Sequence, residues 1–346
     1  SLTKLFGLPG IRAGFAVAYH GHVVPYRVFL LRALPGEEVA LEVREGPDPA
    51  PSPTPEARSA GAPGAVELAA PMEAVEPEAS DAPAGPPSAR YSLRASSGAV
   101  TIREDGGWSW VAPREPGTVH RLVVRRAPDG PGSTDAPADS IVLNAVVMVP
   151  RERLRYGRVE GYRIGSYPSR PYRGLARYRP PRGLLRLTPD LTDLRVSPHF
   201  TLGQFPTHRP RTWPKYLVLQ ERLLLKLELV VERAAARGVP ADAWRVLSGY
   251  RSPWYNRDIG RPKYSRHIYG DAADVYVDVD GDGRMDDLDG DGRVSLRDAG
   301  VLHEIVGRMD RDPALRTLLG GLGKYPVTSR HGPFIHVDTR GYRARW

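Results

Sequence analysis

The chain has no cysteine among its 346 residues, which excludes disulfide bonds and thiolate metal ligands. Any metal ion must therefore be bound by histidine, aspartate, glutamate or backbone oxygen. A chain without cysteine is compatible with an oxidising compartment but does not require one.

Long apolar runs are also missing. No stretch of about 18 or more apolar residues occurs, so we expect no transmembrane segment. Residues 1–10 do not have the charged start and apolar core of a signal peptide. The apolar content of 41% fits a globular protein, and the length allows two or three domains with a buried core.

Charge is distributed unevenly along the chain. Residues 278–298 contain eight aspartates and three arginines, a local balance of −5, so the remainder of this +9 chain carries about +14. Such a basic body suits a polyanionic partner, either nucleic acid or an anionic bacterial cell wall. It is equally compatible with charge that only keeps the protein soluble.

Alternating apolar residues predict an all-β, sandwich-like domain over residues 11–150. The expected strands lie at 15–19, 23–31, 39–43, 91–93, 99–102, 108–110, 119–124 and 141–149. Together they supply about seven short strands, enough for a small sandwich. Residues 46–90 are rich in Pro, Ala, Glu and Ser and predict a flexible excursion, either a loop within one domain or a linker between two β units.

Residues 151–196 are rich in Arg, Tyr and Pro and predict an irregular connector. We expect it to pack through its tyrosines, Tyr156, Tyr162, Tyr167, Tyr172 and Tyr178. Aromatic residues among arginines also suit single-stranded nucleic acid, but no nucleic-acid-binding fold is recognisable, so we expect no nucleic-acid partner. Beyond the connector, apolar periodicity predicts helices over 216–237 and 296–309 and a strand over 244–247.

The most informative stretch runs from Ser265 to Asp274 and has the pattern Ser-x-His-x-x-Gly-x-Ala-x-Asp. His267 and Asp274 are seven residues apart, and His336 follows near the C-terminus. Two imidazoles and one carboxylate form a ligand set for zinc that leaves a fourth position open for water. An open position is typical of catalytic zinc, so the pattern indicates a metallohydrolase.

This pattern occurs with Ser248-Gly-Tyr-Arg251-Ser upstream and with His331 and His336-Val-Asp338 downstream. The combination resembles the zinc D-Ala-D-Ala carboxypeptidases and endopeptidases of the M15 peptidase family. The resemblance covers about residues 197–346, less than half of the chain. It implies an α+β zinc peptidase domain of the hedgehog and D-Ala-D-Ala-peptidase type, with a short antiparallel sheet that carries the zinc, following the all-β domain.

The resemblance also assigns roles. His267, Asp274 and His336 correspond to the three zinc ligands of the family. Arg251 corresponds to its active-site arginine, whose paired donors suit a substrate carboxylate or a developing oxyanion. Ser265 is expected to orient a ligand.

Two further positions are expected to assist. Asp338 is predicted to orient a ligand from outside, as Ser265 does. Many relatives have a glutamate shortly before the last ligand as general base, and others have His-x-His there. This chain has Gly332, Pro333 and Phe334 instead, so His331 becomes the predicted base.

A second metal pattern lies within the same region. Residues 287–298 have carboxylates at positions 1, 3, 5 and 12 and glycine at 6, the order of a calcium loop, and resemble the loops of dockerin modules. Residues 278–286 repeat the start of this pattern. The predicted ligands of structural calcium are Asp278, Asp280, Asp282, Asp286, Asp287, Asp289, Asp291, Arg293 and Asp298. The alternative is a solvated acidic loop.

The sequence therefore predicts a zinc metallopeptidase that hydrolyses peptidoglycan stem-peptide or cross-link amide bonds next to D-amino acids. Peptidoglycan is the expected partner, and the expected location is extracytoplasmic, either periplasmic or secreted. The alternative is a non-catalytic, zinc-containing module that binds the cell wall. The choice between carboxypeptidase and endopeptidase, and the oligomeric state, stay open at this point.

Overall fold

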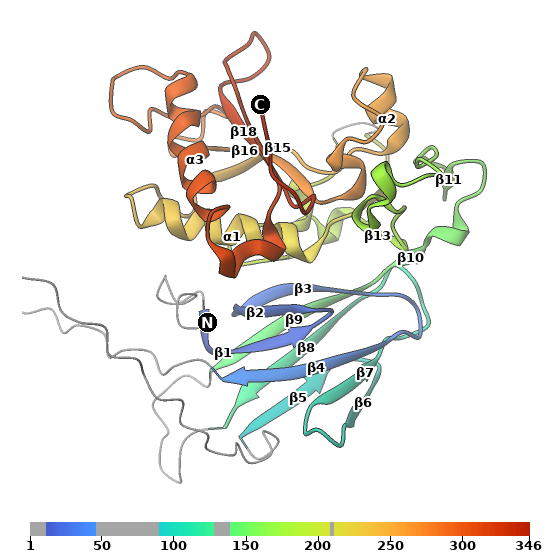
Figure 1. The fold of residues 1–346 in the computed structure, drawn as a ribbon. Coiled ribbons are helices and arrows are strands. Elements are labelled where there is room, and N and C mark those ends of the chain that lie inside the picture. Colours follow the sequence, from blue (N-terminus) through green and yellow to red (C-terminus); the bar gives the residue numbers. More distant parts are fainter. Residues whose placement is uncertain (1–11, 46–89, 128–138, 208–210) are drawn as a thin grey trace, which may run out of the picture.

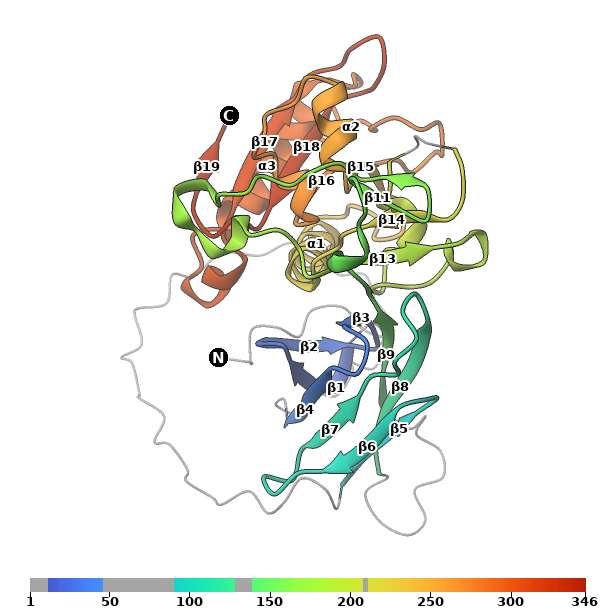
Figure 2. The ribbon, with the colours of Figure 1, turned by 90° about the vertical axis from the view of Figure 1, so that its right-hand side faces the viewer.

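A computed structural model describes residues 12–45, 90–127, 139–207 and 211–346. It is a mixed structure with many strands and few helices, arranged as a β-rich body and a second body that contains all three α-helices of these residues (Figures 1 and 2). No described helix has the length and apolar character needed to cross a membrane. The predicted excursion over 46–90 lies, except for Arg90, outside the described residues.

Two sheets make up the β-rich body, with strand orders β2-β1-β4-β7-β6 and β3-β9-β8-β5. Their bounds are β1 (Arg12–Tyr19), β2 (His22–Tyr26), β3 (Val28–Ala33), β4 (Glu38–Glu45), β5 (Tyr91–Ala95), β6 (Ala99–Ile102), β7 (Trp108–Val111), β8 (Val119–Arg126) and β9 (Ser140–Val147). Neighbouring strands are antiparallel except for β3 and β9. Strands from both sides of residues 46–89 pair directly, as β4 does with β7.

Two of the predicted strands were too long. The apolar run over 23–31 is divided at Arg27 into β2 and β3, which belong to different sheets. The run over 141–149 is likewise divided at Met148, into β9 and β10 (Val149–Pro150). A continuous apolar run shows that a segment is buried, but it does not show where the chain crosses from one sheet to the next.

The predicted irregular connector contains short regular elements. β10, β13 (Gly183–Leu187) and β14 (Lys215–Leu217) form a three-stranded sheet, and β11 (Arg158–Val159) pairs with β12 (Tyr162–Arg163). Its tyrosines pack as predicted at Tyr162 and Tyr178, which are buried. The prediction was wrong for Tyr156, which is fully exposed and has a positive φ of 50°.

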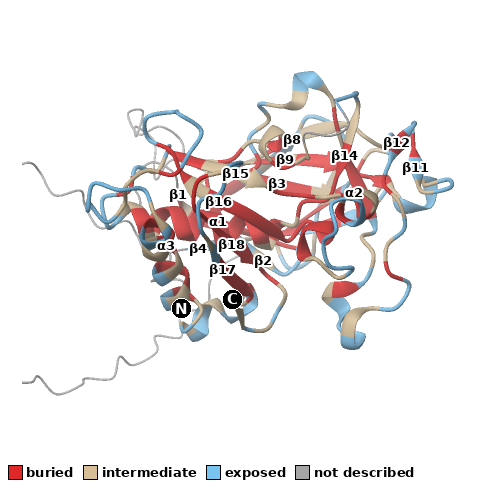
Figure 3. Cartoon of the chain, turned by 90° about the horizontal axis from the view of Figure 1, so that it is seen from above, coloured by how far each residue is buried: buried red, intermediate tan, exposed pale blue. Residues whose placement is uncertain are grey.

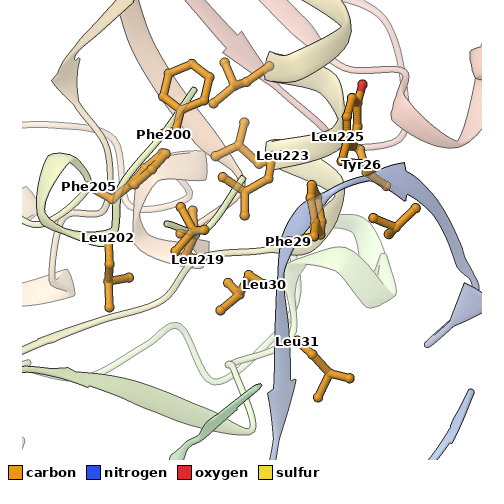
Figure 4. Close-up of a cluster of buried hydrophobic side chains, with 14 of the residues drawn as sticks. Tyr26, Phe29, Leu30, Leu31, Phe200, Leu202, Phe205, Leu219, Leu223 and Leu225 are labelled. Atoms are coloured by element: carbon orange, nitrogen blue, oxygen red, sulfur yellow. The ribbon is translucent and has the colours of Figure 1, made fainter. Parts of the chain in front are cut away.

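The helix predicted over 216–237 begins later, as α1 (Glu221–Ala235), because residues 215–217 pair with β13 as β14. Since residues 216–219 are all apolar, periodicity could not separate that strand from the helix. α1 is the main contact between the two bodies. Buried side chains of β2, β3 and α1 belong to one apolar core (Figure 4), and Figure 3 shows buried residues, in red, in α1 and in strands of both bodies.

Polar contacts support this junction. The Nε of Arg32 in β3 donates to Glu221 at the start of α1 (2.8 Å), and the backbone N–H of Leu30 donates to the carbonyl of Val196 (2.9 Å). Leu223 is fully buried in the shared core. Truncating such a leucine to alanine costs about 2–5 kcal/mol, so the β-rich body and α1 stabilise each other.

The C-terminal sheet has the order β15-β16-β18-β17-β19 and is antiparallel except for the pair β17 and β19. Its strands are β15 (Trp244–Ser248), β16 (Ala272–Val277), β17 (Gly321–Tyr325), β18 (Phe334–Asp338) and β19 (Ala344–Arg345). The helix predicted over 296–309 is confirmed as α3 (Leu296–Met309), which contacts β17 and β18. α2 (Pro253–Asp258) and the short 3-10 helix η8 (Arg266–Tyr269) lie between β15 and β16 in the chain.

Candidate metal centre

Strand pairing brings two distant side chains together. Asp274 in β16 is the direct partner of His336 in β18, and paired residues of adjacent strands project from the same face of a sheet. His267 comes from η8, immediately before β16. The chain turns there at Gly270, with φ of 68° and so little room that a Cβ would lie 2.2 Å from the carbonyl oxygen of Val218. The glycine of the motif is therefore required by geometry.

The three side chains meet at one point. The Nε2 of His267 lies 3.2 Å from the Nδ1 of His336 and 3.3 Å from Oδ1 of Asp274. The Nδ1 of His336 lies 2.8 Å from the same oxygen. Tetrahedral zinc with bonds of 2.0–2.1 Å places its ligand atoms about 3.3 Å apart, so the observed spacing fits that ion. All three residues are buried.

The outward nitrogen of each imidazole is already engaged. The Nδ1 of His267 is 2.7 Å from the carbonyl oxygen of Gly249, and the Nε2 of His336 is 3.1 Å from Oδ2 of Asp338. Both partners are acceptors, so a neutral imidazole carries its proton on that outward nitrogen. Its inward nitrogen then presents a lone pair. Two lone pairs and a carboxylate oxygen thus converge in a buried space, an arrangement that could hold a metal cation.

The protonation of these side chains also favours a bound cation. Burial opposes the charged form of His336, but hydrogen bonds to Asp274 and Asp338 raise its pKa to about 9. Burial lowers the pKa of His267. Burial also works against ionised Asp274, yet the neighbouring imidazoles hold the pKa of that carboxyl well below its usual range. A site that attracts a proton to His336 also attracts a divalent cation, which would displace that proton.

Arg251 contacts the metal centre itself. Its Nη2 donates to Oδ2 of Asp274 (2.8 Å), and its Nε donates to the hydroxyl of Ser248 (3.0 Å). This pair turns the other oxygen of Asp274 toward the two histidines. Nη1 of Arg251 has no hydrogen-bond partner among the described residues, so one part of the guanidinium remains available to a ligand. Its predicted contact with substrate stays a prediction.

A cavity of about 740 Å³ lies beside these residues. Its wall includes Arg251, His331 and all three candidate ligands. Asp274 is the one carboxylate among the described residues of the wall, whereas the cations are Arg251, Arg261, Lys263, Arg266 and Arg340. Arg251, Arg266 and Arg340 are each paired with an aspartate, so Arg261 and Lys263 are the exposed cations of the described wall that favour an anionic ligand. The described wall offers no aspartate or glutamate that would be free to act as a base.

His331 lies in the same wall. Its Nδ1 is 2.8 Å from the carbonyl oxygen of Gly332, which fixes the proton there and leaves Nε2 as an acceptor. The ring meets Phe334 edge-on, with centroids 4.9 Å apart. Phe334 in turn stacks on Tyr325, with centroids 4.7 Å apart. His331 thus has an acceptor nitrogen in the wall of the cavity that contains the candidate metal centre, and its role as general base stays a prediction.

The two predicted orienting residues differ in their contacts. Asp338 accepts from His336, as described, and is also bonded by Arg340, whose Nε lies 2.9 Å from Oδ2. Ser265 lines the cavity, but within the described part of the chain its hydroxyl makes no hydrogen bond to a candidate ligand.

Sequence analysis missed several contributors. Trp346 packs on His336 with ring centroids 5.1 Å apart, and the guanidinium of Arg340 lies 5.1 Å from the Trp346 ring. No local pattern marked that tryptophan. Gly249 acts through its carbonyl, and Ser248 through its hydroxyl. Both were visible in the Ser-Gly-Tyr-Arg-Ser run, but nothing in the run revealed which atom would be used.

The predicted calcium residues lie in and next to two loops, where Asp280, Asp282, Asp289 and Asp291 are exposed and Asp278 is buried. Carboxylate oxygens of Asp278, Asp280 and Asp282 come within 4.8 Å of one another, as do those of Asp287, Asp289 and Asp291. Asp287 accepts from the backbone of Gly290 and Gly292, both at 2.7 Å.

The remaining predicted calcium residues are engaged elsewhere. Asp298 is buried and accepts from the backbone of Leu288 (2.7 Å) and Ser295 (2.6 Å), where it caps α3. Asp286 accepts from the backbone of Val279, and the backbone of Arg293 donates to Asp291 (2.9 Å). Exposed acidic loops of this kind are common without an ion, so calcium stays a prediction.

Comparison with known proteins gives one match. A family model described as Peptidase M15 matches residues 234–286, which include Arg251, His267 and Asp274 but end before His331 and His336. No curated protein matches the chain, and no solved structure does. The match supports membership of the M15 peptidases, which are zinc-dependent, and it suggests a peptidase.

Proposed function

We propose that this chain is a zinc-dependent peptidase that hydrolyses amide bonds next to D-amino acids in the stem peptides or cross-links of peptidoglycan. The observation that carries the proposal is the convergence of His267 Nε2, His336 Nδ1 and Asp274 Oδ1, separated by 2.8–3.3 Å, in the wall of a cationic cavity. The Peptidase M15 match over residues 234–286 supports the same reaction class.

Different residues of the cavity have different roles in the proposed reaction. Zinc supplies Lewis acidity, which polarises a carbonyl and acidifies water. His267, His336 and Asp274 would hold it, with Gly249 and Asp338 fixing the two imidazoles from outside. Nε2 of His331 takes a proton from the attacking water and returns it to the leaving amine. The free Nη1 of Arg251 binds a substrate carboxylate or the oxyanion that develops during attack.

The charge of the chain supports a wall substrate. Peptidoglycan peptides carry free carboxylates, and the cavity wall has one carboxylate among several cations. The basic body outside residues 278–298 would favour approach to an anionic polymer. Peptidoglycan lies outside the cytoplasm, so we propose an extracytoplasmic location, periplasmic or secreted.

The proposal extends to the architecture. Residues 197–346 would form the M15-like α+β peptidase domain of the hedgehog and D-Ala-D-Ala-peptidase type, and residues 11–150 a sandwich-like domain that binds or spaces. The aspartate loops would bind structural calcium. A calcium-dependent rise of the melting temperature that disappears in Asp287→Ala would support that assignment, and an unchanged melting temperature would remove it.

The function is tested with purified peptidoglycan. The zinc-loaded chain is incubated with it, with and without a chelator, and the muropeptides are analysed by mass spectrometry. Loss of one terminal alanine identifies a carboxypeptidase, and conversion of dimers to monomers identifies an endopeptidase. His336→Ala serves as the inactive control. Zinc bound at one equivalent without any product would contradict the proposal and favour a non-catalytic wall-binding module.

A further inference from the structure

A second cavity lies next to the one that contains the metal centre. Its volume is about 550 Å³, and it is bordered by residues 166–169 of the connector and by α2. Arg261 and Lys263 line both cavities. A ligand bound at the metal centre can therefore continue past these two side chains into the second space.

The second cavity is cationic and has no counter-charge. Arg257 lines it together with Arg261 and Lys263, and all three side chains are exposed. Among the described residues none of the three forms an ion pair, and no aspartate or glutamate borders the cavity. Three unpaired cations around one concave space favour a ligand that carries carboxylates.

A buried amide fixes the turn that carries two of these cations. Asn256 of α2 is only 2% exposed, and its Nδ2 donates to the carbonyls of Arg261 (3.3 Å) and Pro262 (3.0 Å). Exchanging the amide nitrogen and oxygen would set the oxygen against both carbonyls, so the orientation is determined. Its Oδ1 has no hydrogen-bond partner among the described residues. The two hydrogen bonds from Nδ2 hold the backbone of the turn that carries Arg261 and Lys263.

The walls of this cavity are held in place. The backbone N–H of Trp254 in α2 donates to the carbonyl of Ile164 (2.9 Å), and Arg163 lies over the Trp254 ring at 4.6 Å. The hydroxyl of Tyr167 is 2.9 Å from that of Tyr250. The connector and α2 are thereby fixed to each other, so the space between them is formed before a ligand arrives.

We propose that the second cavity binds a second, carboxylate-bearing arm of a branched peptide while the amide bond to be cleaved lies at His267, Asp274 and His336. This inference rests on the proposed function and narrows it to a cross-linked peptide as substrate, cleaved by an endopeptidase. The metal cavity would hold the strand that is cleaved, and the adjoining second cavity would hold the strand attached to it.

Arg257 tests the assignment because it borders the second cavity and not the first. Two substrates are compared with the zinc-loaded full chain: a cross-linked muropeptide dimer and a short linear stem peptide. Arg257→Gln removes one charge-assisted contact, so the ratio of KM for the dimer to KM for the linear peptide rises about tenfold, with kcat for the dimer nearly unchanged. Arg257→Lys restores most of the loss.

Arg237→Gln is the matched control. Arg237 is an exposed arginine just beyond α1 that borders neither cavity and has no ion pair among the described residues. Its substitution removes the same charge from the chain and leaves the ratio of KM values unchanged. An equal change in both variants would mean that only net charge matters, and would overturn the assignment.

The outcomes also separate this inference from the function on which it rests. Cleavage of the linear peptide with no cleavage of the dimer, or an unchanged ratio in Arg257→Gln, overturns the second-arm site and leaves the zinc peptidase intact. If the wild-type chain with zinc bound cleaves neither substrate, the proposed function fails, and the second-arm site fails with it.

Discussion

The metal centre and the aspartate loops share metal-binding residue types at metal-like spacings, but the structure uses them differently. In the centre, the outward nitrogens of His267 and His336 are bonded to Gly249 and Asp338, and the inward nitrogens point toward each other and toward Asp274. In the loops, the carboxylate of Asp287 is bonded to the backbone of its own loop. The first arrangement turns three potential ligand atoms toward one point, whereas the second already satisfies part of its own charge. Spacing alone could not separate the two.

The largest effect is expected when a candidate zinc ligand is removed, because this tests whether the centre and the loops really differ. His336→Ala leaves two of the three converging atoms, so bound zinc should fall below about a tenth of an equivalent after dialysis, and hydrolysis to background. Metal content by mass spectrometry is the measurement. His303→Ala, in α3, is the control and should keep its zinc. Equimolar zinc in His336→Ala would show that zinc binds at a site other than this one.

Removing the candidate base separates metal binding from catalysis. His331→Ala should keep one equivalent of zinc, because His331 is not among the converging atoms, while kcat falls about 10²–10⁴-fold. The measurement is kcat from steady-state kinetics, with the same peptide substrate for the variant and the wild type. A kcat within twofold of wild type would exclude His331 as base, and loss of zinc would make it a ligand instead.

The outer contacts of the centre are tested through Asp338. Asp338→Asn weakens the bond to His336 Nε2, and we expect zinc affinity to fall about 10–100-fold. A competitive chelator titration measures the affinity. Because Asp338 also accepts from the backbone of Gly321, circular dichroism must show that the variant is folded. Unchanged affinity in a folded variant would mean that the outer carboxylate does not support the ligand.

The smallest effect is expected in the loops. Asp287→Ala should leave zinc content and kcat unchanged and lower the melting temperature slightly. Backbone hydrogen bonds, that from Gly292 above all, lower the pKa of Asp287 in the folded protein. A carboxyl group whose pKa is lower in the folded protein than in the unfolded one stabilises the fold at pH values above its unfolded pKa of about 3.9. This contribution to stability disappears as the pH falls through the folded pKa.

The measurement for the loops is therefore a melting curve at several pH values. The difference between wild type and Asp287→Ala should be largest near neutral pH and vanish in acid. A variant that loses zinc, or a difference that grows toward acid, would contradict the separation of the loops from the metal centre.

Sequence patterns predicted α3 and most of the strands because those segments carry a regular period bounded by turn residues. They failed where apolar residues run together, at the break near Arg27 and at the start of α1. In both places the end of the element depends on pairing with a distant segment. β2 and β3 join different sheets, and β14 pairs with β13.

The sequence by itself determined the chemistry open to this chain. Without cysteine, and with His267, Asp274 and His336 in a recognisable pattern, it specified a nitrogen and oxygen ligand set for zinc. The tertiary structure decided which atoms remain available. The register of β16 against β18 sets Asp274 opposite His336, and partners in the segment just after β15 and at the end of β18 fix each ring or carboxylate. Local sequence does not encode that choice, because a lone pair becomes free or engaged only through contacts made across the fold.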